Sequence, residues 1–343
     1  MSSLARQNHY VSQGYLKGWS PDGSRVWSYR LLVPGAEYPE WEFRAIKTVA
    51  SRRDLYTSVA SGIDSDDFER WLNAEIEDPA APALEKVRSD QPIDQDDWRR
   101  LAYYVAALDL RTPASYVEHT TRWNQQLPGI LKGIMDGLED SLPRESAEKG
   151  KFACLLRSAP VEPFPIRVTT EKIPGSGKTA VRAEVTCGRE LWLNNMRHVL
   201  TGIARVLVDH SWCILRPNRG SLWFTSDHPV LRLNYYEEGQ YDFGGGWGNP
   251  GSEIIVPLSP RHLMYTKVGS KPFVDSTLSP EMTLSFQRLL AERAHRWIFA
   301  QGQPKRAVWF RPRTEDLAAF LREEQVWEAW HQQQRIAELG EGA

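Results

Sequence analysis

A short polar segment, Thr225-Ser-Asp-His-Pro229, interrupts an apolar run that begins at Leu222 and resumes through Leu233. Proline cannot donate to a sheet ladder and pushes the preceding residue toward extended geometry, so a strand is expected to break here. The side chains of Ser226 and Asp227 can close turns onto the backbone, which would place polar groups at the end of a buried strand. Binding and catalytic groups are often held in such places; a purely structural turn is the alternative.

Three polar residues far from this segment, His9, Glu77 and Arg111, also have side chains suited to a site. A histidine can move protons near neutral pH, and a carboxylate such as Glu77 or Asp227 can orient it or act as a base. Arg111 could neutralise an anionic substrate, or satisfy carbonyls at the end of its helix. The structural alternatives are a solvated face for Glu69 and Glu77 and a capping role for His9.

Helices are expected to position His9, Glu77 and Arg111. Asp94-Gln-Asp-Asp97 supplies acidic cap and first-turn residues for a helix with a wide apolar stripe from Trp98 to Leu110, which Pro113 ends or kinks. An earlier helical pattern begins at Asp64 and is expected to be interrupted at Asp78-Pro-Ala-Ala-Pro82.

The second half of the chain is richer in short strand patterns. The expected strands share short apolar or alternating runs next to turn residues: Trp212–Arg216, Leu222–Phe224, Glu253–Leu258, His262–Thr266 and Arg296–Ala300. This order predicts an α+β fold, with a helix-rich N-terminal half packed on a mainly antiparallel sheet built largely from the C-terminal half. We expect residues 1–142, a mainly helical half with an N-terminal strand, and residues 152–343 to form one compact unit, with a polar boundary at Pro143–Lys151.

Two glycine-containing loops invite functional interpretations. Pro174-Gly-Ser-Gly-Lys-Thr179 resembles part of a phosphate loop, but that motif needs a glycine at Lys172 and a helix after Thr179, so a polar hairpin loop is expected. Asp242–Gly251 could cover a pocket, or could be a surface excursion.

The composition excludes several classes of function. The 42 basic and 44 acidic residues nearly cancel, which argues against a broad nucleic-acid surface or membrane binding. The first ten residues lack an apolar run, so a signal peptide is not expected, and no segment approaches the length needed to span a bilayer. Three widely spaced cysteines show no metal-type spacing. We therefore expect a soluble, cytoplasmic protein.

Taken in order, these segments resemble a bacterial family known as domain of unknown function 4238. The matching motifs follow the order of the family pattern: His9-Tyr-Val-Ser12, Glu69 with Ile76-Glu77, Arg111-Thr-Pro113, Thr225–Pro229 and Pro257-Leu-Ser-Pro260. The likeness runs from His9 to about Ala300. The sequence departs from the pattern at Ser12 instead of proline, at His228 instead of asparagine, and at Gln287 where asparagine is preferred. The resemblance supplies no activity.

Two functions follow as hypotheses. The first is a hydrolase or nuclease-like enzyme acting on a phosphate-bearing substrate, with His9, Glu77, Arg111 and Asp227 as catalytic residues. Tyr10, Ser226 and His228 would bind the substrate, which would be an anionic small molecule or a nucleotide. The second is a binding or sensor module whose polar motif residues form a buried structural network. The spacing of Glu77 and Asp227 gives no support for a metal ion, and the sequence identifies no cofactor or protein partner.

Overall fold

The computed structural model describes residues 4–60, 63–141, 166–172, 179–237, 239–271 and 276–339. Helices and antiparallel sheets are both present, so the expected α+β class is confirmed. The boundary expected at Pro143–Lys151 lies outside the described residues, and so does most of the Pro174–Thr179 loop.

A five-stranded antiparallel sheet is formed wholly by the C-terminal half of the chain, in the order β10-β15-β14-β12-β13. Its strands are β10 (Cys213–Leu215), β12 (Leu231–Glu237), β13 (Gln240–Asp242), β14 (Glu253–Pro257) and β15 (Leu263–Lys267). The central strands β14 and β15 are almost entirely buried, which explains their continuous apolar sequences.

A four-stranded sheet mixes both halves of the chain, in the order β11-β16-β2-β4. Its strands are β2 (Arg25–Arg30), β4 (Glu42–Ala45), β11 (Thr225–Ser226) and β16 (Trp297–Ala300). The separation into a helical front half and a sheet-forming back half is therefore not confirmed, because β2 and β4 come from the front half. This sheet carries the polar segment that interrupts the apolar run: β11 ends at Ser226, and the chain resumes as β12 at Leu231. The strand expected at Leu222–Phe224 is irregular backbone, in which Trp223 and Phe224 are buried and Leu222 is exposed.

Helix α4 (Gln95–Leu110) is largely buried from Leu101 onward and starts as expected, because Asp94 and Asp97 form a reciprocal capping box. It is preceded by α2 (Asp67–Leu72), a π-helical turn (Asn73–Glu77) and α3 (Asp78–Arg88). The interruption expected at Asp78–Pro82 does not occur: the helix continues from the π-helical turn into α3, with Pro79 at the start of α3 and Pro82 inside it. Glu77 ends the π-helical turn, an irregularity often found at functional sites.

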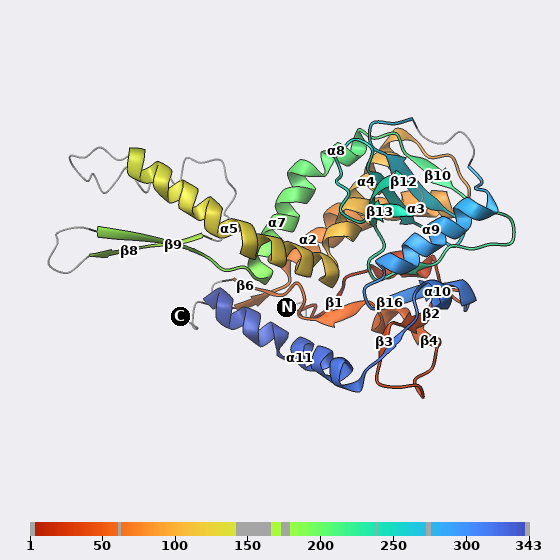
Figure 1. Ribbon diagram of the computed structural model, residues 1–343, viewed down its shortest axis with the longest axis horizontal. Helices are drawn as coiled ribbons and strands as arrows, with labels where there is room; N and C mark the ends of the chain where they lie inside the picture. The colour runs from red at the N-terminus through yellow and green to blue at the C-terminus, as the bar shows by residue number, and fades with distance from the viewer. Residues whose placement is uncertain are drawn as a thin grey trace.

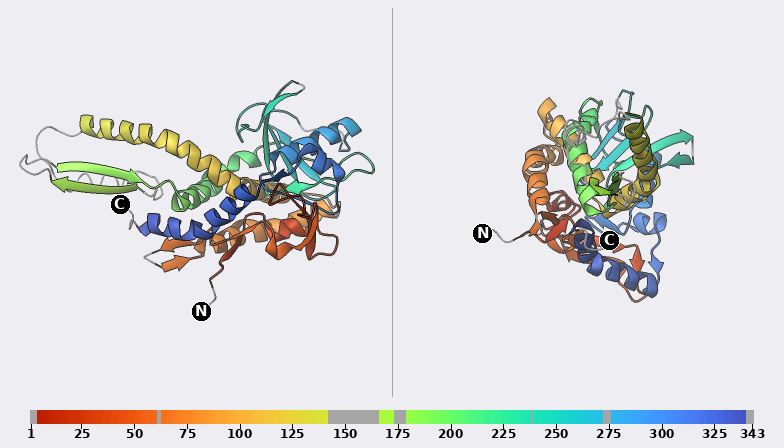
Figure 2. Two further views of the ribbon diagram at one scale, coloured as in Figure 1. Left: turned by 60° about the horizontal axis from the view of Figure 1, so that its bottom comes forward. Right: turned by 90° about the vertical axis from the view of Figure 1, so that its left-hand side faces the viewer.

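One end of the molecule is elongated. Helix α5 (Pro113–Ser141) and the hairpin of β8 (Ile166–Lys172) and β9 (Thr179–Val185) point away from the two sheets in the same direction (Figures 1 and 2). The strand that begins at Thr179 confirms that no phosphate-loop helix follows. Helix α7 (Arg189–His198), a π-helical turn (Val199–Ile203) and α8 (Arg205–Val208) return the chain to the body.

The remaining elements tie the termini to the body. Helix α9 (Pro280–Arg293) leads into β16, and α10 (Lys305–Phe310) packs on α9. Helix α11 (Leu317–Leu339) then runs beside β3 and β6 along one edge of the molecule (Figure 1). The short elements are β1 (Gln7–His9), α1 (Gln13–Lys17), β3 (Leu32–Val33), a 3-10 turn (Ile46–Thr48), β5 (Ser51–Arg53), β6 (Ser58–Ala60), β7 (Ile63–Ser65) and β17 (Thr314–Glu315).

Candidate functional site

Arg111 is the centre of the first group of motif residues. It caps the C-terminal end of α4 and is 1% exposed. Its guanidinium donates one hydrogen bond to the Glu77 carboxylate and another to the main-chain carbonyl of His9. The Tyr56 hydroxyl donates to the Arg111 carbonyl at 2.5 Å. Three of the sequence-predicted residues thus meet at one buried ion pair.

The His9 ring is buried beside this ion pair, although Arg111 binds the main-chain carbonyl of His9 and not its ring. Burial lowers the pKa of His9, and the charge of Arg111 lowers it further. The ring is therefore neutral at neutral pH. Its Nε2 atom has no hydrogen-bond partner among the described residues, which leaves one polar atom of the motif uncommitted.

Glu69 belongs to the same group, because the charges of Arg111 and Glu77 both act on its carboxyl group. It is 9% exposed, and its Oε2 atom lacks a hydrogen-bond partner in the described parts of the chain. Burial raises the pKa of Glu69 to about 7, although the positive charge of Arg111 opposes the shift. Glu69 is therefore a carboxyl group that titrates near neutral pH, which is a property that acid and base catalysts share.

A cavity of about 250 Å³ reaches the motif residues at Glu77, whose side chain is 18% exposed. Ser12 and Tyr104 also line this cavity, and their hydroxyl groups are 2.6 Å apart. The family pattern has proline at position 12, so this hydroxyl pair depends on the departure at Ser12. Among the motif carboxylates, Glu77 is therefore the one that solvent reaches, through this cavity.

Asp227 is the centre of a second group. It is 3% exposed, and its two carboxylate oxygens accept the backbone N–H groups of His295 and Arg296, both at 2.9 Å. Burial raises the pKa of Asp227, while the neighbouring His295 and these N–H groups oppose the shift. The carboxylate therefore fastens the end of β11 to the start of β16.

Ser226 and His228 flank Asp227 and are also buried. The Ser226 hydroxyl accepts the backbone N–H of His228 at 3.1 Å, as expected of a turn that a serine side chain closes. The His228 Nε2 atom lies 3.2 Å from Nη2 of Arg293. Because burial holds the pKa of His228 well below its usual value, this ring is neutral and can accept from the arginine.

Tyr10 lies between the two groups. Its side chain is buried, and burial together with the charge of Asp227 raises the pKa of its hydroxyl. Two consecutive residues therefore contact different groups. The His9 carbonyl accepts a hydrogen bond from Arg111, and the Tyr10 hydroxyl is close enough to Asp227 for the two to interact electrostatically. Within the described ranges no hydrogen bond or ion pair joins Arg111 directly to Asp227.

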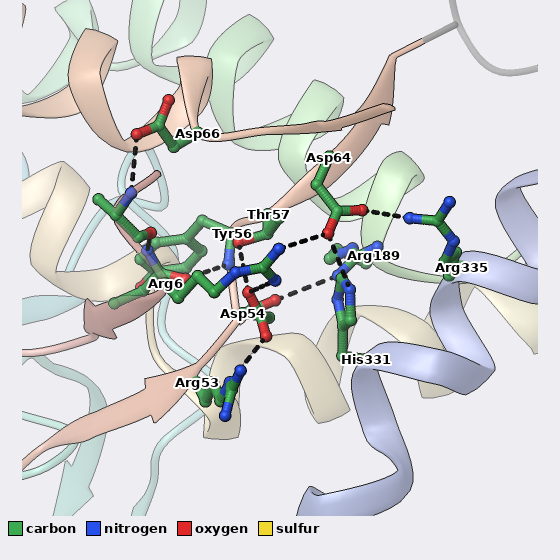
Figure 3. Close-up of polar contacts among 12 residues, drawn as sticks. Arg6, Arg53, Asp54, Tyr56, Thr57, Asp64, Asp66, Arg189, His331 and Arg335 are labelled. Atoms are coloured by element: carbon green, nitrogen blue, oxygen red, sulfur yellow. Dashed lines mark hydrogen bonds and ion pairs between the residues drawn. The ribbon is translucent and has the colours of Figure 1, made fainter. Parts of the chain in front are cut away.

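A further polar network was not expected from the sequence. Figure 3 shows the Arg6 guanidinium between two carboxylates, with its Nη1 2.9 Å from Asp54 and its Nη2 3.0 Å from Asp64. Helix α11 reaches the same network through His331, whose Nε2 lies 3.6 Å from Asp64, and through Arg335, which also pairs with Asp64. These arginines and aspartates are isolated in the sequence and share no regular spacing, so the sequence could not predict that they form one network.

A cavity of about 530 Å³ adjoins this network, between the β1–β5 pair and α11. Helix α11 contributes Trp327 and His331 to its wall, and the opposite wall carries three arginines, Arg6, Arg52 and Arg53. Arg52 lies over the Trp327 ring at 4.9 Å. Arg53 is 75% exposed and pairs with Asp54 at 3.3 Å. Arg53 therefore offers solvent-facing positive charge, which the two motif groups do not, although Asp54, Glu324 and Glu328 also line the cavity.

Neither a metal centre nor a membrane segment was found in the parts of the chain that the structure describes. Among these residues, no three His, Cys, Asp or Glu side chains gather as a metal ion would require. None of the described helices combines the length and apolarity needed to cross a bilayer.

The fold and the motif residues define an α+β protein in which two buried polar groups are joined through His9 and Tyr10. The chain belongs to the family DUF4238, described as proteins of unknown function, which matches residues 7–303. Helix α11 and Arg6 lie outside the matched segment, so the cavity beside α11 is only partly lined by family-matched residues. Comparison with curated proteins and with solved structures found no match.

Proposed function

We propose that this protein is a non-catalytic binding module in which the motif residues hold the scaffold together. The observation that supports this proposal is the pairing of the motif side chains with one another and with backbone groups. Arg111 is bound to Glu77 and to the His9 carbonyl, and Asp227 is bound to two backbone amides. Buried charges need such partners, so a network of this kind stabilises a fold without contacting a ligand.

The ligand that fits the proposal is a small anionic molecule such as a nucleotide or a sugar phosphate, bound in the cavity beside α11. Arg53 would contact the anionic group, because its guanidinium is exposed and the fork of an arginine matches phosphate geometry. Glu328 on the α11 wall could accept hydrogen bonds from ligand hydroxyl groups. Arg6 is held by Asp54 and Asp64, so it would add positive potential without moving.

Calorimetric titration of the purified chain with adenosine monophosphate and ribose phosphate tests this function. We expect at least one to bind, and Arg53→Gln to weaken it about tenfold, since a lost charge-assisted hydrogen bond is worth roughly 1.4 kcal/mol here. Arg99→Gln is the matched control, because Arg99 is an exposed arginine paired with Asp96 and lies outside the cavity lining. The proposal fails if neither compound binds, or if both variants bind equally well.

The hydrolase or nuclease-like function is the second candidate, and the titration of Glu69 near neutral pH favours it. In that function His9, Glu77, Arg111 and Asp227 would be the catalytic residues, and Tyr10, Ser226 and His228 would bind a phosphate-bearing substrate. The substrate would enter through the cavity at Glu77. Assays with phosphodiesters, nucleotides and esters, with and without divalent cations, test it. Turnover that Glu77→Gln abolishes without loss of thermal stability would replace the binding-module proposal.

A further inference from the structure

Two arginines from different elements converge on one carboxylate, and one of them, Arg293, also meets His228 of the Asp227 group. Arg232 on β12 and Arg293 on α9 each donate to Glu118 on α5, over Nη2–Oε2 and Nη2–Oε1 distances of 3.1 and 2.9 Å. Each arginine thus takes a different oxygen of the same carboxylate. This is the arrangement in which two arginines bind a carboxylate ligand.

The burial of the three side chains is uneven. Arg293 is 11% exposed and Arg232 is 24% exposed, whereas Glu118 is 40% exposed. Holding two partly buried guanidinium groups at one point costs electrostatic energy. Buried Asp109, which pairs with Arg232, compensates part of that cost, and exposed Glu118 adds little. Nε of Arg293 has no hydrogen-bond partner in the described part of the chain, whereas Nε of Arg232 is ion-paired with Asp109. Stability therefore gives little reason for exposed Glu118 to be the shared partner of both arginines.

Buried neighbours fix both arginines in place. Nε of Arg232 lies 3.2 Å from Oδ2 of Asp109, which is 2% exposed and also accepts the Trp247 indole N–H at 2.9 Å. Arg293 lies over the Phe243 ring at 5.6 Å and meets His228. These contacts hold the two guanidinium groups before any ligand arrives, which lowers the entropic cost of binding.

The charges at this place favour a ligand with one negative charge. The two arginines carry two positive charges, and Asp109 with Glu118 balances them when both carboxyl groups are ionised. His228 stays neutral, because burial lowers its pKa, and burial lowers the pKa of the nearby His119 to about 4. A ligand carboxylate that replaces Glu118 would preserve neutrality, whereas a phosphate dianion would add an uncompensated charge beside buried Asp109.

We propose that Arg232 and Arg293 form a binding site for the carboxylate of a small organic acid, and that Glu118 fills this site when the acid is absent. The site is distinct from the cavity beside α11 and does not depend on the function proposed above. The ligand approaches from solvent, because Glu118 is the exposed member of the group. Glu118 competes with the ligand carboxylate for the two arginines. Replacing Glu118 should therefore raise the affinity of the site for the organic acid.

Glu118→Gln tests the site, with acetate, inorganic phosphate and chloride compared at equal ionic strength by thermal unfolding and by calorimetric titration. We expect Glu118→Gln to bind acetate at least about tenfold more tightly than the unmodified chain does, and acetate to raise its Tm more than chloride does. Glu315→Gln is the matched control, because Glu315 is 46% exposed and pairs with one arginine, Arg313, at 3.6 Å. This control should leave acetate binding unchanged.

Double variants test whether acetate binds at Arg232 and Arg293. Arg232→Lys added to Glu118→Gln should remove the gain in acetate affinity, because lysine lacks the planar fork; Arg232 is the more exposed arginine and the safer one to replace. Arg53→Gln added to Glu118→Gln should leave the gain intact, since Arg53 lines the cavity beside α11. The proposal is overturned if Glu118→Gln gains no affinity, if it prefers phosphate to acetate, or if Arg53→Gln and not Arg232→Lys removes the gain.

Discussion

Arg111 binds Glu77 and the main chain of His9 at the same time, so one buried guanidinium joins α4, the π-helical turn and the N-terminal strand β1. We predict that Arg111→Met lowers the free energy of unfolding by about 3–5 kcal/mol, because it leaves the Glu77 charge and the His9 carbonyl without their donor. Urea denaturation followed by circular dichroism measures this change.

Arg99→Met is the control for that substitution, since Arg99 lies on the same helix but is exposed and pairs only with Asp96. Its effect on unfolding should be small. If Arg111→Met unfolds at the same urea concentration as the control, Arg111 does not hold the scaffold. A loss of ligand binding or turnover at unchanged stability would instead assign Arg111 to a functional site.

The convergence on Arg111 could be predicted from the sequence only in part. The ordered motifs indicated that His9, Glu77 and Arg111 belong together, but the residue types could not show that His9 contributes its backbone carbonyl and not its ring. A side-chain pattern carries no information about which main-chain groups lack partners. The α+β class was accessible from periodicity, yet the partners of β16 were not, because β2 lies about 270 residues earlier and strand pairing is not local.

Glu69 gives a prediction about pH. Its pKa is about 7 in the folded chain and 4.5 in the unfolded reference, so the folded state holds more protons between these values. Stability must therefore fall as pH rises through this range, by about 3 kcal/mol from this group. We predict that Glu69→Gln removes that part of the pH dependence and is more stable than the unmodified chain above neutral pH. Urea denaturation across a pH series provides the measurement.

Glu75→Gln is the comparison for the pH series, because Glu75 is an exposed carboxylate in the π-helical turn next to Glu77. The Glu75→Gln profile should follow that of the unmodified chain. Parallel profiles for Glu69→Gln and Glu75→Gln would show that Glu69 does not titrate differently in the folded state.

Asp227 accepts two backbone N–H groups with its two oxygens, and an asparagine offers only one acceptor oxygen. We predict that Asp227→Asn lowers the free energy of unfolding by about 1–3 kcal/mol, because one buried N–H at the start of β16 loses its partner. Asp242→Asn is the control, since Asp242 also accepts a backbone N–H, from Gly244, but at the surface. Equal thermal unfolding of the two variants would exclude a structural role for the second oxygen.

Gly245 allows the glycine-rich loop to lie directly on β12. Its N–H donates to the Arg232 carbonyl at 3.2 Å, and a Cβ atom added there would lie 2.8 Å from the carbonyl carbon of Arg232 and 2.9 Å from the nitrogen of Leu233. These neighbours are backbone atoms of a paired strand, which cannot move aside without disturbing β12. The loop must therefore shift if Gly245 becomes alanine.

We predict that Gly245→Ala destabilises the protein by roughly 1–3 kcal/mol, a typical cost of overpacking, and raises amide hydrogen exchange from Gly245 to Trp247. The shift would withdraw the Trp247 indole N–H from Asp109, whose other oxygen already has no partner among the described residues. Gly248→Ala tests the specificity of this effect, because its added Cβ would meet Val206 at an ordinary 3.7 Å. Since both glycines belong to one loop, a general intolerance of the loop to alanine would affect both variants, whereas the close approach to β12 affects only Gly245→Ala.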